Sequence, residues 1–179
     1  MKFAKVALVI AMGLAGISVA NAADQGHGTV TFKGSIIDSP CSITGDTVEQ
    51  DVPLGQVSNA ALENEGTSTP VYFDIDLENC TTETAKSVQV TFTGAPDPTD
   101  SAILGLTGDA SGAGVVIADS SGKQLDLGTP SVAQNLGEGS NTLTFAAYLK
   151  GDKPGSMGAS STIVPGDFQS TANFTLAYN

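Results

Sequence analysis

The chain has 179 residues and is strongly acidic, with 19 Asp and Glu residues against 7 Lys and no Arg, so its formal net charge is −12 at pH 7. Such a chain lacks the cations that neutralise phosphates, which argues against nucleic acids and anionic membrane surfaces as partners. Its 21 Gly residues and its short apolar stretches, separated by turn formers, indicate an antiparallel all-β fold.

The first 22 residues have the composition of a secretory signal peptide. Lys2 and Lys5 precede an apolar run, and Ala20-Asn21-Ala22 supplies the small residues of a cleavage site. We expect cleavage before Ala23, which leaves five Lys against 19 acidic residues, a net charge of −14, in a single domain. An uncleaved anchor is the alternative, although the apolar run is shorter than the roughly 20 residues of a spanning helix, and no later segment is expected to insert into a membrane.

The two cysteines, Cys41 and Cys80, both belong to the part of the chain that would be exported. An oxidising compartment predicts a disulfide between them, which would stabilise the fold by roughly 3 to 4 kcal/mol. The single histidine, His27, is far from both cysteines in the sequence, so a zinc site lacks ligands and no metal or cofactor is expected.

Alternating apolar and polar residues predict half-buried strands at 28–36, 71–78 and 87–92, and a weaker strand is expected near 52–54. Residues 59–62 are compatible with one helical turn. In the strand at 71–78 the polar positions are Asp74, Asp76 and Glu78. A cation site is one interpretation of these acids, but alternating acids usually form the solvated face of a strand.

The second half of the chain continues the pattern. Residues 115–117 and 124–127 predict a hairpin whose turn contains Gly122, and further strands are expected at 142–149 and 167–178. The total of seven or eight strands is typical of an immunoglobulin-like sandwich. Two segments rich in Pro and Gly, 94–100 and 151–158, are expected to be exposed loops.

The last expected strand has apolar side chains on one face, at Phe168, Phe174, Leu176 and Tyr178. A terminal strand is often an edge, and an apolar edge favours aggregation unless another strand covers it. An interior strand of a finished sandwich is the alternative, and periodicity alone does not decide between the two.

Short motifs follow one another in a fixed order through the mature part of the chain. They are GTVTFKG at 28–34, CSI at 41–43, VPLGQ at 52–56, LENC at 77–80, Asn135-Leu136-Gly137, FAAY at 145–148, PGDF at 165–168 and the penultimate Tyr178. In this order, and with this pair of cysteines, the chain resembles the major structural pilins of chaperone-usher fimbriae, of the type 1 and mannose-resistant Proteus-like group.

The resemblance implies an incomplete immunoglobulin-like β-sandwich that lacks its final strand, with an N-terminal donor strand extension. A periplasmic chaperone would first fill the groove beside the last strand. At an outer-membrane usher, the N-terminal extension of the next pilin subunit would then replace the chaperone by β-strand addition. The product would be a homopolymer exported through the periplasm and displayed on the cell surface, where it supports adhesion and biofilm formation.

Carried over residue by residue, the resemblance divides the chain into a signal peptide (1–22), a donor strand extension (23–34) and the pilin domain (35–179). The side chains expected to face the neighbour's groove are Gly26, Gly28, Val30 and Phe32. The groove strand, to which chaperone and donor both pair, would use Gly166, Phe168, Phe174, Leu176 and Tyr178. Without the resemblance, 28–34 reads as the first strand of its own domain.

The sequence contains no nucleophile elbow, P-loop or dinucleotide-binding motif, so we expect no enzymatic activity. A major subunit of a fimbrial shaft is the leading interpretation. A minor or adaptor pilin of the same fold is one alternative. A complete secreted β-sandwich that acts as a binding module is another.

Overall fold

The structure is a computed structural model that describes residues 27–154 and 162–179. The expected signal peptide, the first mature residues and Gly26 lie outside the described residues. Contacts divide the chain into two units, Met1–Ile36 and Ile37–Asn179, which we describe separately. In the part of the chain that the structure describes, no helix is long and apolar enough to cross a membrane.

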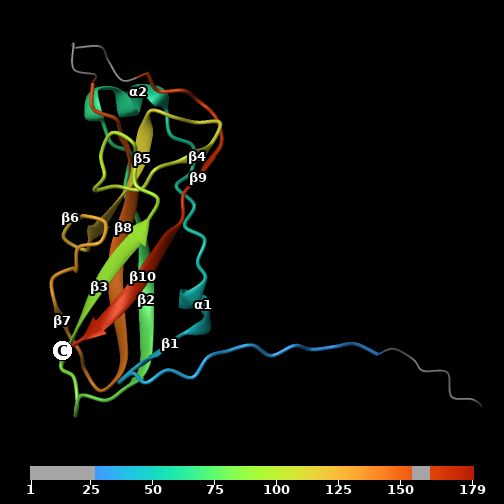
Figure 1. Ribbon diagram of the computed structural model, residues 1–179, viewed down its shortest axis with the longest axis vertical. Helices are drawn as coiled ribbons and strands as arrows, with labels where there is room; N and C mark the ends of the chain where they lie inside the picture. Colours follow the sequence, from blue (N-terminus) through green and yellow to red (C-terminus); the bar gives the residue numbers. More distant parts are fainter. Residues whose placement is uncertain (1–26, 155–161) are drawn as a thin grey trace, which may run out of the picture. The chain divides into compact units, whose positions relative to one another are not determined.

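The second unit is built from antiparallel strands, as the sequence predicts (Figure 1). The strands are β1 (Ser42–Ile43), β2 (Val71–Cys80), β3 (Ser87–Gly94), β4 (Thr107–Gly108), β5 (Ala113–Asp119), β6 (Gln124–Leu125), β7 (Gln134–Asn135), β8 (Gly139–Gly151), β9 (Phe168–Gln169) and β10 (Ala172–Tyr178). The helical elements are α1 (Gly45–Val48), α2 (Asn59–Leu62) and the 3-10 helix η1 (Glu63–Glu65). The helical turn expected at 59–62 is therefore present.

Two sheets pack face to face. One has the strand order β1-β2-β8-β5-β6 and the other has the order β10-β3-β7, while β4 and β9 form a separate pair. Three phenylalanines join the sheets, because Phe92 of β3 packs against both Phe73 of β2 and Phe145 of β8, with ring centroids 6.2 and 5.0 Å away. Edge-on contacts of this kind add to the free energy gained by burying the rings.

The predicted disulfide joins Cys41 to Cys80 and ties the chain just before β1 to the end of β2. Both cysteines are buried in the core cluster. The predicted hairpin is also present as β5 and β6, and Gly122 in its turn has a φ of +84°, a conformation that favours glycine.

Several expectations about local structure are wrong. No strand forms at 28–36 or at 52–54 among the described residues, and Pro53 removes one of the backbone donors that a strand at 52–54 would need. The loop at 94–100 is not fully exposed, because the Asp97 side chain is buried. Of the loop expected at 151–158, residues 155–158 lie outside the described range.

The last expected strand is divided into two. Residues 168–169 pair with β4, whereas Ala172–Tyr178 pair with β3, so the chain changes sheets between them. Ser170 fixes this break, because its hydroxyl donates to the carbonyl oxygen of Gly105 at 2.8 Å instead of facing solvent. Near-regular alternation of apolar residues on both sides of the break conceals it in the sequence.

Candidate functional site

An open groove of about 1110 Å³ runs along one side of the second unit. Residues 50–57 line one wall, and residues 163–170 with 172–174 line the other. In Figure 1 these walls are the teal trace between α1 and α2 and the red trace leading into β10. Eight residues in extended conformation span about 26 Å, so walls of this length are suited to a peptide strand rather than a compact small molecule.

The floor of the groove is the hydrophobic core itself. Inward side chains from both sheets line it, namely Phe73, Ile75, Phe92, Leu104, Val115, Ile117, Ala147 and Leu149. Phe73 pairs directly across the strands with Phe145, yet Phe145 is 0% exposed and Phe73 is only partly buried. The two rings belong to the same layer, so their difference in exposure shows that no described residue covers Phe73 on the groove side.

The wall formed by β10 is an unpaired sheet edge. Asn179 and Ser87 exchange two backbone hydrogen bonds of 2.9 Å, which fixes the alternation along the β10–β3 ladder. The N–H and C=O groups of Phe174, Leu176 and Tyr178 therefore point away from β3, where no described strand pairs with them. An incoming strand would find backbone donors and acceptors at every second residue.

The opposite wall is unpaired as well. Among the described residues, the backbone of 51–57 makes no hydrogen bond, while the side chain of Gln50 holds the start of this wall to β2 by donating to the Asp74 carbonyl at 2.7 Å. Val52, Leu54 and Val57 are half-buried toward the groove. A strand lying in the groove could thus pair on both sides.

The structure places the predicted groove residues together at this site. Phe168 and Phe174 line the groove, and Leu176 and Tyr178 continue the same face of β10, packed against the core and only partly buried. The Tyr178 hydroxyl is inaccessible to solvent and makes no hydrogen bond within the described part of the chain.

Gly166 has a different role from the apolar residues. It lines the groove, but a Cβ atom at this position would lie 2.8 Å from backbone atoms of Asp109 and Ala110. Those two residues donate their N–H groups to the carbonyl oxygen of Asp167, at 3.0 and 3.2 Å. Gly166 therefore permits the close approach that holds this wall in place.

The predicted donor residues are apolar and exposed where the structure describes them. Val30 is 74% exposed and Phe32 is 91% exposed, and Gly28 has no atom within 4 Å of where a Cβ would be. The described part of this segment therefore presents two large apolar side chains at alternate positions.

Comparison with known proteins identifies the family. A model of the fimbrial protein family matches residues 30–179. The chain belongs to this family. It is 56% identical to the major MR/P fimbria protein of Proteus mirabilis and 51% identical to the fimbria A protein of Serratia marcescens, and in each case the match covers 99% of both chains.

Solved structures support the same conclusion for the pilin. A chaperone-usher pilus, from work on rod uncoiling, contains a chain with 33% identity and a TM-score of 0.73, covering 87% of this chain and 97% of that one. The P pilus rod subunit PapA has 28% identity and a TM-score of 0.69, covering 79% and 100%. The predicted immunoglobulin-like sandwich that lacks a strand is confirmed, and the pilin is a structural fimbrial subunit, not an enzyme.

Sequence reasoning found one wall of the groove and missed the other. Residues 52–56 form one of the motifs of the family resemblance, but the alternation predicts a strand at 52–54 and not a groove wall. The signal in the sequence is Pro53 followed two residues later by Gly55, and in the structure Gly55 has a φ of +74°. Such a segment is poorly suited to a central strand of a finished sheet.

Proposed function

We propose that this pilin is the major subunit of a fimbrial shaft and that residues 23–34 of one subunit form the missing strand of the next. The observation that carries the proposal is a groove whose floor is the hydrophobic core and whose walls leave backbone groups unpaired among the described residues, along one edge of β10 and at 51–57. A segment with exposed Val30 and Phe32 in the same chain supplies the complementary side chains.

The energetics favour such an exchange. Full burial of Val30 or Phe32 contributes roughly 1.5 to 3 kcal/mol each, and each new ladder hydrogen bond contributes about 0.5 to 1.5 kcal/mol net. Residues 23–34 contain one Asp and one Lys, so their formal charge is zero with His27 neutral. The free amino group of Ala23 adds a positive charge near neutral pH, so inserting the segment adds no negative charge to the acidic groove, whose walls include Asp51 and Asp167.

The route to the fibre follows from the open groove. Exposed core would aggregate during export, so we infer that a periplasmic chaperone occupies the groove after the signal peptide is removed and that an outer-membrane usher exchanges it for the donor strand. The similar solved chain comes from a chaperone-usher pilus. The assembled fibre would support adhesion and biofilm formation.

A major subunit is favoured over a minor or adaptor pilin. The 56% identical relative is named a major fimbria protein, and the 38% identical PRS pilin of Escherichia coli is likewise named major. Copy number per fibre, counted from the protein composition of purified fimbriae, would separate the two roles.

Replacing Phe32 with glutamate tests the donor strand. Phe32→Glu should abolish fibres in electron micrographs of expressing cells, because a charge cannot enter the apolar groove. The matched control is Thr31→Glu, which adds the same charge on the opposite side of the extended segment and should leave fibre number near that of the wild type.

Co-expression sharpens the test. A Phe32→Glu subunit keeps its own groove, so it can accept a wild-type strand but cannot donate one, and it should shorten wild-type fibres in proportion to its share of the subunits. Normal fibres from Phe32→Glu alone would refute the donor role. Equal loss with Thr31→Glu would mean that charge, not the buried face of the strand, causes the defect.

A further inference from the structure

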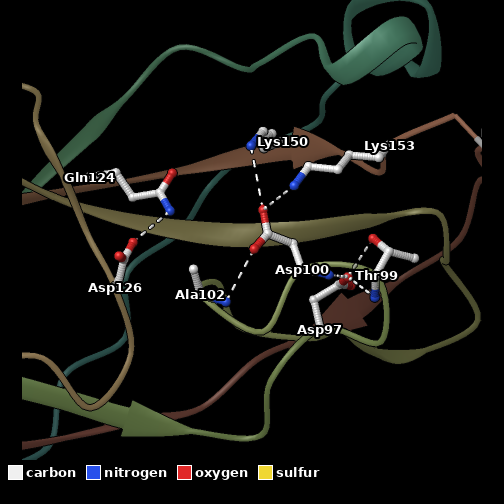
Figure 2. Close-up of polar contacts among 8 residues, drawn as sticks. All are labelled: Asp97, Thr99, Asp100, Ala102, Gln124, Asp126, Lys150 and Lys153. Carbon is white, nitrogen blue, oxygen red and sulfur yellow. Dashed lines mark hydrogen bonds and ion pairs between the residues drawn. The ribbon is translucent and has the colours of Figure 1, made fainter.

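The loop between β3 and β4, residues 95–106, carries a buried carboxylate that organises it (Figure 2). Asp97 is 5% exposed, and its Oδ1 accepts hydrogen bonds from the Thr99 backbone and hydroxyl, both at 2.8 Å, and from the Asp100 backbone at 3.1 Å. Charged hydrogen bonds of this kind are stronger than neutral ones, so Asp97 fixes the first turn of the loop.

The far end of the same loop forms part of the groove. Leu104 lines the groove and exchanges two backbone hydrogen bonds with Val115, of 2.9 and 2.8 Å. The neighbouring carbonyl of Gly105 accepts the hydrogen bond from the Ser170 hydroxyl at 2.8 Å, and Ser170 belongs to the groove wall. The position of the loop and the position of this wall are therefore linked.

The loop is held on its outer side by charges from the end of β8. The ammonium groups of Lys150 and Lys153 lie 3.6 and 3.8 Å from Oδ2 of Asp100, and Figure 2 shows both reaching it from above the loop. Asp152 lies between these lysines in sequence, and its backbone N–H donates to the Gly112 carbonyl at 2.9 Å.

Asp152 is the carboxylate of this group that the structure satisfies least. Its Oδ1 is inaccessible to solvent and makes no hydrogen bond with any described residue. Burial raises its pKa above the ordinary value of 3.8, and the negative charge of Asp97 adds to the rise. The Thr99 hydroxyl opposes the rise, and Asp100 adds to it more weakly.

Several charged groups lie on the elements around this site, and Asp97 and Asp100 are the ones that raise the pKa of Asp152. On the β3–β4 loop and the end of β8 these groups are Asp97, Asp100, Lys150 and Lys153, and the exposed acids on the adjoining segments are Glu63, Glu65 and Asp109. Acids outnumber lysines, so a proton on Asp152 relieves repulsion. Within the described residues, no three acids, His or Cys gather as metal ligands.

We propose that Asp97 and Asp152 are positioning residues for the groove, and that uptake of a proton by Asp152 tightens the β3–β4 loop against the wall that holds the donor strand. This inference rests on the proposed function, because the quantity it changes is the release of that strand. Fibres should therefore hold their subunits more firmly in mild acid than at neutral pH.

The sign of the effect follows from the direction of the pKa change. When packing raises the pKa of a carboxyl, its protonation stabilises the packed arrangement. This stabilisation is fully present at pH values below the ordinary pKa and is lost as the pH rises through the raised pKa. Each unit of pKa rise corresponds to at most a tenfold change, so we expect subunit release to be about two- to tenfold slower near pH 4.5 than near pH 7.5.

The test uses fibres assembled from the full mature subunit and placed in guanidinium chloride at a series of pH values. Monomer release is followed on gels run without heating. Asp152→Asn should remove most of the pH response, whereas Asp126→Asn, which deletes one exposed charge outside the cluster, should keep it. Ser170→Ala cuts the bond from the wall to the loop, and it should accelerate release and flatten the pH profile.

The outcomes separate the two proposals. A wild-type pH response that survives in Asp152→Asn fibres, or that disappears equally in Asp126→Asn fibres, would overturn this inference and leave the donor strand intact. A steep dependence of subunit release on pH in Ser170→Ala fibres would also contradict this inference, because the loop would then affect release without its hydrogen bond to the groove wall. Fibres from Phe32→Glu would instead overturn the proposed function.

Discussion

Strands β8 and β10 carry the same kind of sequence and reach different states of burial. The inward side chains of β8 are Leu143, Phe145, Ala147 and Leu149, and all are buried. Those of β10 are Phe174, Leu176 and Tyr178, and all are only partly buried. The difference lies in the neighbours, because β8 pairs with β2 and β5 on its two edges, whereas among the described residues β10 pairs with β3 alone.

The comparison shows what an alternating pattern encodes. It determines which face of a strand turns inward, but not which molecule provides the adjoining strand. In β8 both neighbours come from the same chain, so folding completes the burial. In β10 the apolar face reaches the open groove. A strand bound there would gain about 1.5 to 3 kcal/mol of binding free energy for each large apolar side chain that becomes fully buried.

The largest expected effect separates the two strands in the unassembled subunit. Phe145→Ala should lower the free energy of unfolding by about 3 to 5 kcal/mol, since it leaves a cavity in a closed core. Phe174→Ala should lower it by only about 1 to 2 kcal/mol, because its ring is already partly solvated. The chain has no Trp, so urea unfolding is best followed by circular dichroism.

Assembly into fibres should bring the stability loss caused by Phe174→Ala closer to that caused by Phe145→Ala. In fibres the donor strand would cover Phe174, so Phe174→Ala should weaken denaturant resistance of the fibre more than it weakens the free subunit. Equal losses for the two substitutions in the free subunit would mean that the groove is closed in solution, and the contrast between β8 and β10 would then be incorrect.

The next effect concerns the disulfide, which braces β2 at the end of the sheet that contains β8. Replacing both Cys41 and Cys80 with serine should cost about 3 to 4 kcal/mol in the chain-entropy model. The groove walls contain neither cysteine, so the few subunits that fold should still polymerise. If subunits without the disulfide kept their full stability in urea unfolding but failed to form fibres, the disulfide would act in assembly and not in stability, contrary to this prediction.

The sequence predicted the fold better where strands pair with other strands of the same chain than around the open groove. The strands predicted at 71–78 and 142–149, which the structure shows as β2 and β8, the disulfide and the β5–β6 hairpin follow from local alternation, cysteine number and turn chemistry. The failures gather around the groove. At 52–54 the backbone has no partner among the described residues, and between Gln169 and Ala172 the chain changes partners, which depends on tertiary contacts that no local pattern contains.

The candidate site was predicted in part for the same reason. Periodicity placed Phe168, Phe174, Leu176 and Tyr178 on one face, and family resemblance was required to interpret that face as an acceptor. The buried Asp97 was mistaken for an exposed loop residue, because Pro and Gly neighbours predict loops without saying which polar side chain turns inward. The Pro-Asp-Pro-Thr-Asp sequence is suited to the observed turn, in which the backbone N–H groups of Thr99 and Asp100 donate to the Asp97 carboxylate, but it does not say that the carboxylate is buried.

The smallest expected effect lies in the β5–β6 turn, far along the chain from β10. The Ser121 hydroxyl and the backbone of Ser121 and Lys123 donate to Asp119, and the first of these hydrogen bonds does most to lower the pKa of Asp119 below 3.8. A lowered pKa stabilises the fold above the ordinary value, and this stability is lost as pH falls through the lowered value. Asp119→Asn should therefore cost less than about 0.5 kcal/mol near neutral pH, and urea midpoints measured across the acid range should show the loss shrinking below pH 3.8.

The pH dependence expected at Asp119 is opposite to that expected at Asp152. Asp119 lies by the completed sheet and Asp152 near the open groove, so the two residues together test whether these regions behave differently. Acid should weaken the hairpin turn through Asp119 while strengthening the groove through Asp152. The double variant Asp119→Asn with Asp152→Asn should lose both responses additively, because the two sites share no hydrogen-bond partner. A coupling between them in urea midpoints would mean that the groove and the completed sheet do not behave as separate regions.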